Sequence, residues 1–173
     1  MVRIINKNEV DIRGYFYVNQ LNQRTYYVSA VCHASFVETV CACRNRQTAI
    51  KIVNQLNAVL RGLKFSRNSF QFFEKQNLAP LTQDKYINEG EIDLHGYFYA
   101  SKCGIDAGLE VYEARFCFCE GYHEYAITLG TFYDRELVVE TIDELNKVLR
   151  GLKFSKNSFQ FFDKKYLEIV IVS

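Results

Sequence analysis

Cysteine and histidine residues gather in a few short stretches that could form a metal site. These residues are Cys32, His33, Cys41, Cys43, Cys117, Cys119 and His123. Structural zinc is usually held by turns of the C-x-x-C type, which curl around the ion. A C-x-C pair on an extended strand separates its sulfurs by about 7 Å. We therefore predict reduced, buried and structural thiols, with no metal and no cofactor.

The segment CEGYHEY is the one stretch whose residue types resemble a general acid–base site. It gathers Glu120, His123 and Glu124, and a histidine beside carboxylates can titrate near neutral pH. The corresponding segment of the first half, CHASFVE, shares only a loosely placed histidine. The chain has no P-loop, G-x-G-x-x-G, H-E-x-x-H or G-x-S-x-G motif. We predict an exposed charged turn here, and an enzyme using these Cys, His and Glu residues is the third of three functional alternatives.

Charge divides the chain into two unlike halves. Residues 1–86 contain 12 Lys and Arg against 5 Asp and Glu, and residues 87–173 contain 9 against 15, so the halves carry +7 and −6. In the basic half, arginines alternate with tyrosines, a combination that suits single-stranded nucleic acid because cations contact phosphates while rings stack on bases. The candidate residues for this function are Arg13, Arg24, Arg44, Arg46, Tyr15 and Tyr17. The alternative is a solvated basic face over core tyrosines.

The acidic half supports a rival function, the binding of another protein. Its carboxylates could imitate the charge of nucleic acid and occupy a basic groove on a partner, as an inhibitor would. We give this function a slight preference because the net charge of the whole chain is only +1. The candidate residues are Glu140, Asp143, Glu144, Arg61, Lys64, Arg150 and Lys153. The opposite charges of the halves could also join two copies of the chain.

Two segments of the chain occur twice. VLRGLKFSRNSFQFFEK at 59–75 returns as VLRGLKFSKNSFQFFDK at 148–164, and EVDIRGYFY at 9–17 matches EIDLHGYFY at 91–99. The spacing between copies grows from 82 to 89 residues, so the second copy holds seven extra residues, which we place in the SKCGIDAGLE turn. We infer a tandem duplication in which the near-identical segment makes matched contacts between copies. Direct binding of a ligand by RGLKFS is the alternative.

Each copy reads as three strands followed by one helix. Residues 10–19, 25–34 and 36–44, and then 92–101, 109–119 and 124–133, are rich in β-branched and aromatic residues. Helical spacing of apolar residues follows in both copies. Asp134 is the predicted N-cap of the second helix, and Gly62 and Gly151 are predicted left-handed residues at the two helix ends. Gly14 and Gly96 suggest a bulge or the close approach of another backbone.

These elements predict an α+β protein made of two β-β-β-α repeats, packed as a pseudo-twofold unit that buries the open sheet faces. A short fourth strand could follow at SFQFF, where helical spacing is the alternative, and YLEIVIVS is a closing strand. The repeats span residues 1–75 and 91–173, with a linker at 76–90. This order is similar in topology to single-strand-binding folds of the whirly and PUR type, without those families' motifs. With no signal peptide or membrane span, we expect a cytoplasmic protein.

Overall fold

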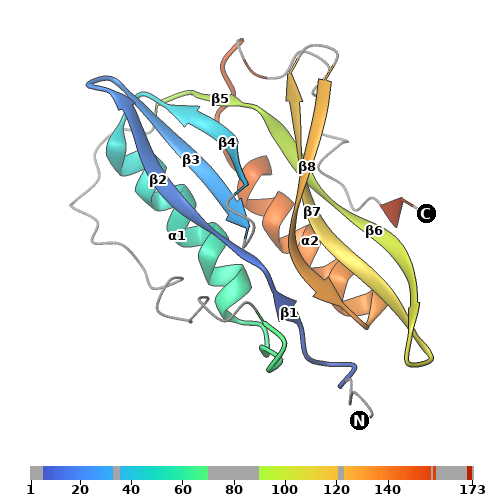
Figure 1. Ribbon diagram of the computed structural model, residues 1–173. Helices are drawn as coiled ribbons and strands as arrows, with labels where there is room; N and C mark the ends of the chain where they lie inside the picture. Colours follow the sequence, from blue (N-terminus) through green and yellow to red (C-terminus); the bar gives the residue numbers. More distant parts are fainter. Residues whose placement is uncertain are drawn as a thin grey trace.

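The computed structural model describes residues 6–32, 36–69, 90–120, 123–156, 158 and 171–172. Over these residues the chain is an α+β protein with two antiparallel sheets and two helices (Figure 1). The predicted fold class is therefore confirmed at this level. The SFQFF segments beyond Ser69 and Ser158, and the predicted linker up to residue 89, lie outside the described residues.

The first sheet has the strand order β2-β3-β4-β5. Its strands are β2 (Gly14–Asn22), β3 (Thr25–Cys32), β4 (Val37–Cys43) and β5 (Ile92–Leu94). The second sheet has the order β1-β8-β7-β6-β9. Its strands are β1 (Asp11–Ile12), β8 (His123–Phe132), β7 (Leu109–Glu120), β6 (Gly96–Asp106) and β9 (Ile171–Val172). Each predicted strand is found within a few residues of its expected place, and β9, parallel to β6, is the described part of the closing strand.

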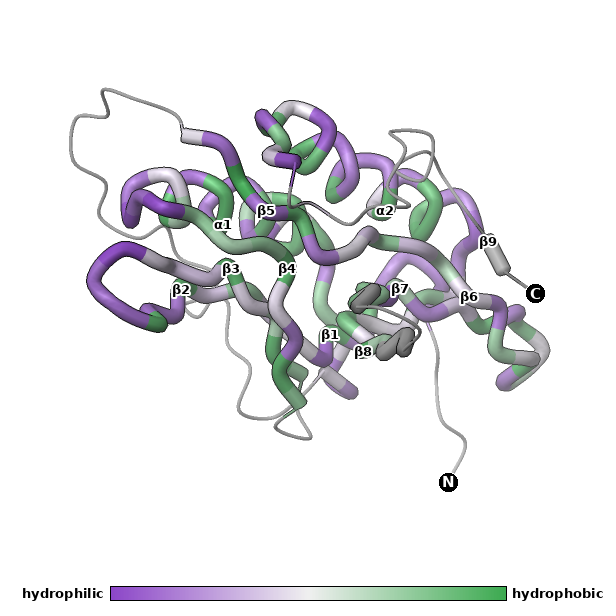
Figure 2. The backbone as a smooth tube through the Cα atoms, turned by 90° about the horizontal axis from the view of Figure 1, so that it is seen from above, coloured by the Kyte–Doolittle hydropathy of each residue, from purple (hydrophilic) through white to green (hydrophobic). Residues whose placement is uncertain are grey.

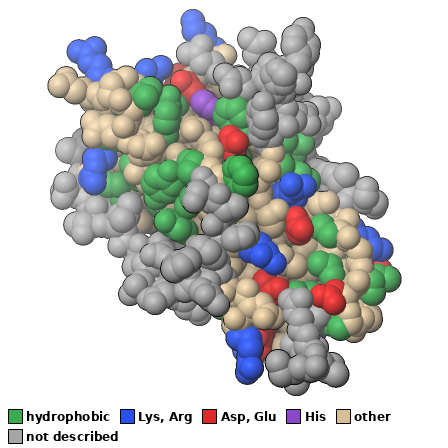
Figure 3. Space-filling view, in the orientation of Figure 1, with side chains coloured by type: hydrophobic (Ala, Val, Ile, Leu, Met, Phe, Trp, Pro, Cys, Tyr) green, Lys and Arg blue, Asp and Glu red, His purple; other side chains and the backbone are tan. Residues whose placement is uncertain are grey.

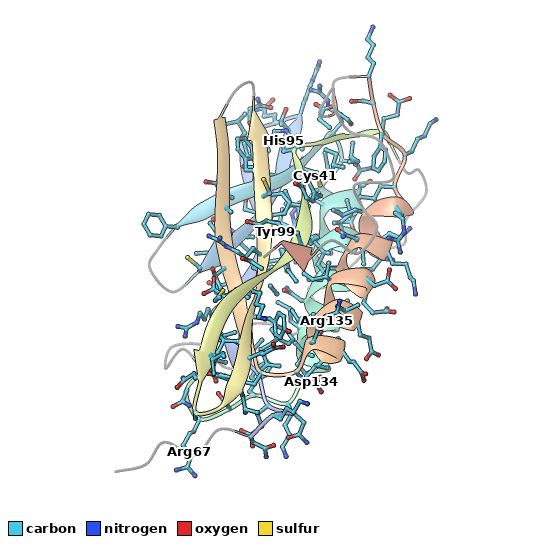
Figure 4. The ribbon with its side chains drawn as sticks, turned by 90° about the vertical axis from the view of Figure 1, so that its right-hand side faces the viewer. Cys41, Arg67, His95, Tyr99, Asp134 and Arg135 are labelled. Atoms are coloured by element: carbon cyan, nitrogen blue, oxygen red, sulfur yellow. The ribbon has the colours of Figure 1, made fainter. Side chains whose placement is uncertain are left out.

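Helices α1 (Arg46–Arg61) and α2 (Arg135–Arg150) lie together on the same side of both sheets (Figures 2 and 4). Strand alternation decides which side chains meet them, since neighbouring residues of a strand point to opposite faces. In the twice-occurring Gly-Tyr-Phe-Tyr motif, Phe16 and Phe98 enter the core and contact each other with ring centres 5.7 Å apart. The tyrosines of the motif consequently point to the faces away from the helices.

Two short strands cross between the halves and join them. β1 precedes β2 in the chain, but it pairs with β8 of the second sheet. Reciprocally, β5 precedes β6 but pairs with β4 of the first sheet. The sequence predicted that the halves would meet by burying their open sheet faces. In the described residues the halves contact each other through these exchanged strands, through α1 and α2, and through strands of the two sheets such as β3 with β8 and β4 with β7.

The repeated segment after each helix holds the exchanged strand in place. The Ser66 hydroxyl donates to the Asp11 carboxylate, and the Ser69 hydroxyl donates to the Val10 carbonyl while accepting from the Ile12 amide, at 3.2 and 3.0 Å. The second half repeats these contacts with Ser155 on Asp93 and with Ser158 on Ile92 and Leu94. This gives the near-identical FS(R/K)NS segments a structural role.

A buried asparagine on each helix satisfies the backbone beside it. Asn57 of α1 accepts from the Phe16 amide at 3.0 Å and donates to the Phe16 carbonyl at 2.9 Å. Asn146 of α2 does the same for Phe98, at 3.1 and 2.9 Å. Since β2 is an edge strand, these groups of Phe16 have no neighbouring strand to pair with. On β6 the described pairing with β9 is at Ala100 and Ser101, so each carboxamide bonds to backbone groups that no described neighbouring strand pairs with.

The predictions for Gly14 and Gly96 are confirmed, whereas those for Gly62 and Gly151 are right about the helix ends and wrong about the handedness. A Cβ at Gly14 or Gly96 would collide with the carbonyl oxygen of the neighbouring strand, so the predicted close approach of backbones is present. Gly62 and Gly151 are not left-handed, because their φ angles are −75° and −80°. The amides of the two C-cap glycines bond back to the last turn, and the next residues continue directly toward the exchanged strands without a reversal.

The remaining local predictions concern the helix start and the seven extra residues. Asp134 is the N-cap of α2, as expected, and accepts from the Glu136 amide at 3.1 Å. The pair Gly96 and Phe118 is 22 residues apart, whereas the matching pair Gly14 and Cys32 is 18 apart, so four extra residues lie in the exposed β6–β7 hairpin. By the same comparison of paired residues, the other three lie in the β7–β8 hairpin.

Candidate binding surfaces

The described cysteines do not form a metal site. Cys41 and Cys43 are buried and face the helices, whereas Cys117 is buried on the other side of its sheet. Cys103 is exposed, so the prediction of buried thiols is wrong for this residue. Within the described ranges no group of His, Cys, Asp or Glu could hold an ion. His33 and the side chains of Cys119, Glu120, His123 and Glu124 lie outside the described part of the chain.

The face of each sheet opposite the helices carries a pair of tyrosines, and we call these the two open faces. On the first sheet, Tyr15 and Tyr17 have ring centres 6.3 Å apart with planes tilted by 50°. On the second sheet, Tyr97 and Tyr99 are 6.1 Å apart with a tilt of 49°. All four rings are half-buried, so each keeps part of its surface open to solvent. Burial, and then the neighbouring Tyr15, raises the pKa of Tyr17, which stays uncharged at neutral pH.

The two open faces differ in polarity. The first-sheet face combines the tyrosines with uncharged polar residues such as Ser29 and Thr39, and three exposed hydrophobic residues, Leu21, Phe36 and Val37, lie on or beside its strands. The second-sheet face carries Glu113 and Arg115 on β7. Figure 3 shows hydrophobic side chains over β2 and β3, while positive and negative side chains are mixed over β7 and β8.

The structure separates the six residues predicted for nucleic acid. Tyr15 and Tyr17 share the first open face, as their spacing predicts. Arg13, however, lies over the second sheet, where its Nε donates to the Thr131 hydroxyl at 3.0 Å. Arg24 is exposed in the β2–β3 turn, and Arg44 lies 3.6 Å from Asp93 at the end of β4. Arg46 is the exposed first residue of α1.

The residues predicted for a protein partner lie on the helix side of the molecule or just beyond it. Glu140 and Glu144 are exposed on α2, but Glu144 pairs with Lys147 at 3.1 Å and Asp143 pairs with Arg150 at 3.1 Å. Arg61 is half-buried at the end of α1. Lys64 and Lys153 follow the helices, and their carbonyls accept from the exchanged strands. Ion pairs within the helix thus offset part of the negative charge that this prediction requires.

A groove with a volume of about 540 Å³ lies between the two helices. Val59 and Val148, the first residues of the two near-identical segments, line it together with Glu144 and Lys147. It is the feature of the helix side that could receive a protein segment, because it combines apolar and charged lining.

Sequence reasoning missed Tyr97, Tyr99 and Arg115 as candidate surface residues. The signal for the tyrosines was present, because Gly-Tyr-Phe-Tyr occurs in both halves. The net negative charge of the second half argues against this signal, but net charge does not show which face each side chain occupies. Arg115 gave no local signal, since only the strand pairing places it opposite Tyr99 on the same face.

In comparisons with known proteins, no family model, no curated protein and no solved structure matches the chain. Among the described helices, none has the length and apolar character needed to cross a bilayer.

Proposed function

We propose that the protein binds single-stranded nucleic acid on the two open faces of its sheets. The observation that carries this proposal is the repeated Gly-Tyr-Phe-Tyr motif, which presents Tyr15 and Tyr17 on one face and Tyr97 and Tyr99 on the other. Aromatic rings on a sheet can stack on successive bases without reading their identity, and each such contact contributes about 1–3 kcal/mol. On each face the tyrosines keep part of their surface exposed, although Ser29 of the first face and Cys117 of the second are buried.

The cations near these faces support the same function. Arg13 and Arg115 lie over the second sheet, and Arg24 and Arg44 lie at the ends of strands of the first sheet. Guanidinium groups bind phosphate oxygens through several donors at once. A protein of near-zero net charge can hold a charged backbone when its cations are grouped on the surface that the backbone crosses.

The test is binding of a fluorescently labelled 20-nucleotide single strand, followed by anisotropy. We expect the single strand to bind more tightly than the matching duplex, whose bases are already stacked. The double variant Tyr17→Ala and Tyr99→Ala is expected to lose roughly 30-fold or more in affinity, from two stacking contacts. Tyr17→Phe with Tyr99→Phe is the matched control and keeps the rings. Equal binding by the alanine and phenylalanine variants would refute the role of stacking.

A protein partner is the second candidate, and the groove between α1 and α2 is the observation that favours it. We propose that a basic, partly apolar segment of the partner would contact Glu144 there. Reversing the charge of Glu140, Asp143 and Glu144 should then abolish capture of such a partner, while leaving oligonucleotide binding intact. If the variant loses oligonucleotide binding as well, these carboxylates stabilise the fold and are not a specific contact with the protein partner.

We also propose that the chain is a tandem duplication whose halves form a pseudo-twofold unit. The matched serine, asparagine and glycine contacts of the two halves, together with the reciprocal exchange of β1 and β5, support it. Under this proposal the open faces are two versions of one surface, and the differences between them reflect divergence after duplication.

A further inference from the structure

The cations at equivalent positions of the two open faces are distributed unequally. The exchanged strand β1 brings Arg13 onto the second sheet, and its backbone amide donates to the Leu129 carbonyl at 2.9 Å. The corresponding residue beside the first sheet is His95, which bonds in the same way to Val40. By strand pairing, Arg115 of the second face corresponds to Ser29 of the first. The second face therefore has two guanidinium groups where the first has an imidazole and a hydroxyl.

The two guanidinium groups are held differently. The Nε of Arg13 donates to the Thr131 hydroxyl, whereas the Nε of Arg115 is buried without a hydrogen-bond partner among the described residues and lies 3.9 Å from the Glu113 carboxylate. Thr131 and Glu113 are partners across β8 and β7, so the two arginines lie on one face about one to two strand spacings, or roughly 5–10 Å, apart. The terminal nitrogens of each arginine remain as donors.

The carboxylates beside this pair are themselves engaged. Glu113 accepts from the Thr128 hydroxyl at 2.8 Å, and Asp11 is buried and accepts from the hydroxyls of Ser66 and Tyr133. These two carboxylates lower the local positive potential. Because they are bonded to hydroxyl groups of the protein, the terminal nitrogens of Arg13 and Arg115 are the groups that would contact a ligand. Tyr99 is the cross-strand partner of Arg115, so a stacking ring and a guanidinium group stand side by side.

We propose that Arg13 and Arg115 form the phosphate-anchoring site of the bound single strand, while the first open face contributes stacking with little electrostatic binding. This inference rests on the proposed function and assigns the backbone contact to the second sheet, in the half that is acidic overall. The site is composite, because the exchanged strand of the basic half supplies Arg13 and the acidic half supplies Arg115. Arg13, whose Nε is already held by the Thr131 hydroxyl, loses less side-chain entropy on binding than an arginine in a loop.

The experiment measures the affinity of the labelled 20-nucleotide single strand at several salt concentrations. For single strands the logarithm of the binding constant falls by about 0.7 per logarithm of salt for each phosphate contact. We expect Arg13→Gln with Arg115→Gln to make the slope shallower by about 1.4, and Arg115→Lys to restore its share. Tyr15→Ala with Tyr17→Ala should lower affinity without changing the slope. Arg135→Gln, at the exposed start of α2, is the matched control and should change neither.

The outcomes separate the two proposals. If the wild type does not bind the single strand, the proposed function fails and this inference fails with it. If the wild type binds but the arginine variants keep its salt slope, the inference alone is overturned. Far-ultraviolet circular dichroism and thermal melting of each variant identify a folding defect. If the double variant is defective, the single variants Arg13→Gln and Arg115→Gln decide, because each removes one charge and should make the slope shallower by about 0.7.

Discussion

The buried asparagine of each helix offers the sharpest test of how this fold is held together. Asn146 is fully buried, and its carboxamide satisfies both the amide and the carbonyl of Phe98, which is also fully buried. Leucine has a similar branched shape but no polar atoms, and its two methyl groups make it the larger side chain. Asn146→Leu should therefore leave two buried backbone groups without partners.

The expected cost follows from these two groups. Each buried backbone group left unsatisfied costs about 1–3 kcal/mol, and the gain from burying leucine offsets about 1–2 kcal/mol of the sum. We expect a net loss of about 1–4 kcal/mol in the free energy of unfolding. A typical domain is stable by about 5–15 kcal/mol, so the variant should fold but be clearly weakened. With a urea dependence near 2 kcal/mol per molar, the midpoint should fall by about 0.5–2 M.

Urea unfolding followed by circular dichroism measures this loss, and the chain supplies two comparisons. Asn57→Leu removes the matching contacts to Phe16 and should cost a similar amount. Gln55→Leu makes the same kind of change at an exposed position of α1 and should shift stability by no more than about 0.5 kcal/mol.

Asn146→Asp adds a pH dependence to the same test. The ionised carboxylate would still accept from the Phe98 amide but would face the Phe98 carbonyl, so its loss relative to wild type should be larger at pH 7 than at pH 4, where protonation restores a donor. The reasoning is refuted if Asn146→Leu unfolds within about 0.5 kcal/mol of the wild type.

Three further predictions test other contacts. Gly96→Ala should destabilise the protein by about 1–3 kcal/mol in thermal melting, because its Cβ would meet a carbonyl oxygen. Gly151→Ala should stabilise it by about 0.4–1 kcal/mol, because Gly151 is right-handed and its Cβ would lie 3.7 Å from the nearest atom. The opposite order of stabilities would contradict the backbone geometry. Ser155→Ala should cost about 1–3 kcal/mol by removing the hydroxyl bonded to Asp93, and a double-mutant cycle with Asp93→Ala would show no coupling if that bond were unimportant. Iodoacetamide should modify the exposed Cys103 before the buried cysteines of the native protein. The reaction at pH 8 should be slow, because partial burial and then Glu113 raise the pKa of this thiol and so reduce the fraction of thiolate. Mass spectrometry identifies the modified site, and earlier modification of Cys41 would contradict its burial.

Much of the local structure could be predicted because it depends on neighbours in the chain. The strands around Phe16 and Phe98 follow from alternating β-branched and aromatic residues, and the start of α2 at Asp134 follows from a carboxylate placed before an amphipathic run. The close approach at Gly14 and Gly96 could also be anticipated, since a glycine inside a strand at matching positions signals a backbone that tolerates no Cβ. These features need only short-range sterics and hydrogen bonds.

The functional surface could be predicted only in part, because net charge averages over residues that point in different directions. The arginines and tyrosines of the basic half looked like one surface, yet Arg13 lies over the second sheet while Tyr15 and Tyr17 lie on the first. The carboxylates of α2 looked like a negative surface, yet Asp143 and Glu144 are paired with cations of the same helix. Such pairings depend on helix geometry and on strand register as well as on composition.

The sequence by itself determined the repeat, the order of strands and helices, and the side chains that alternate toward the core, because a repeat is visible in letters and periodicity is a local property. The tertiary structure decided the exchange of β1 and β5, since a two- or three-residue strand carries no record of a partner far along the chain. It also decided the handedness at Gly62 and Gly151, because the residues that follow them hydrogen-bond to the exchanged strands. Arg13 and Arg115 likewise share one face only in the folded chain, because a strand of the basic half, β1, completes the sheet of the acidic half.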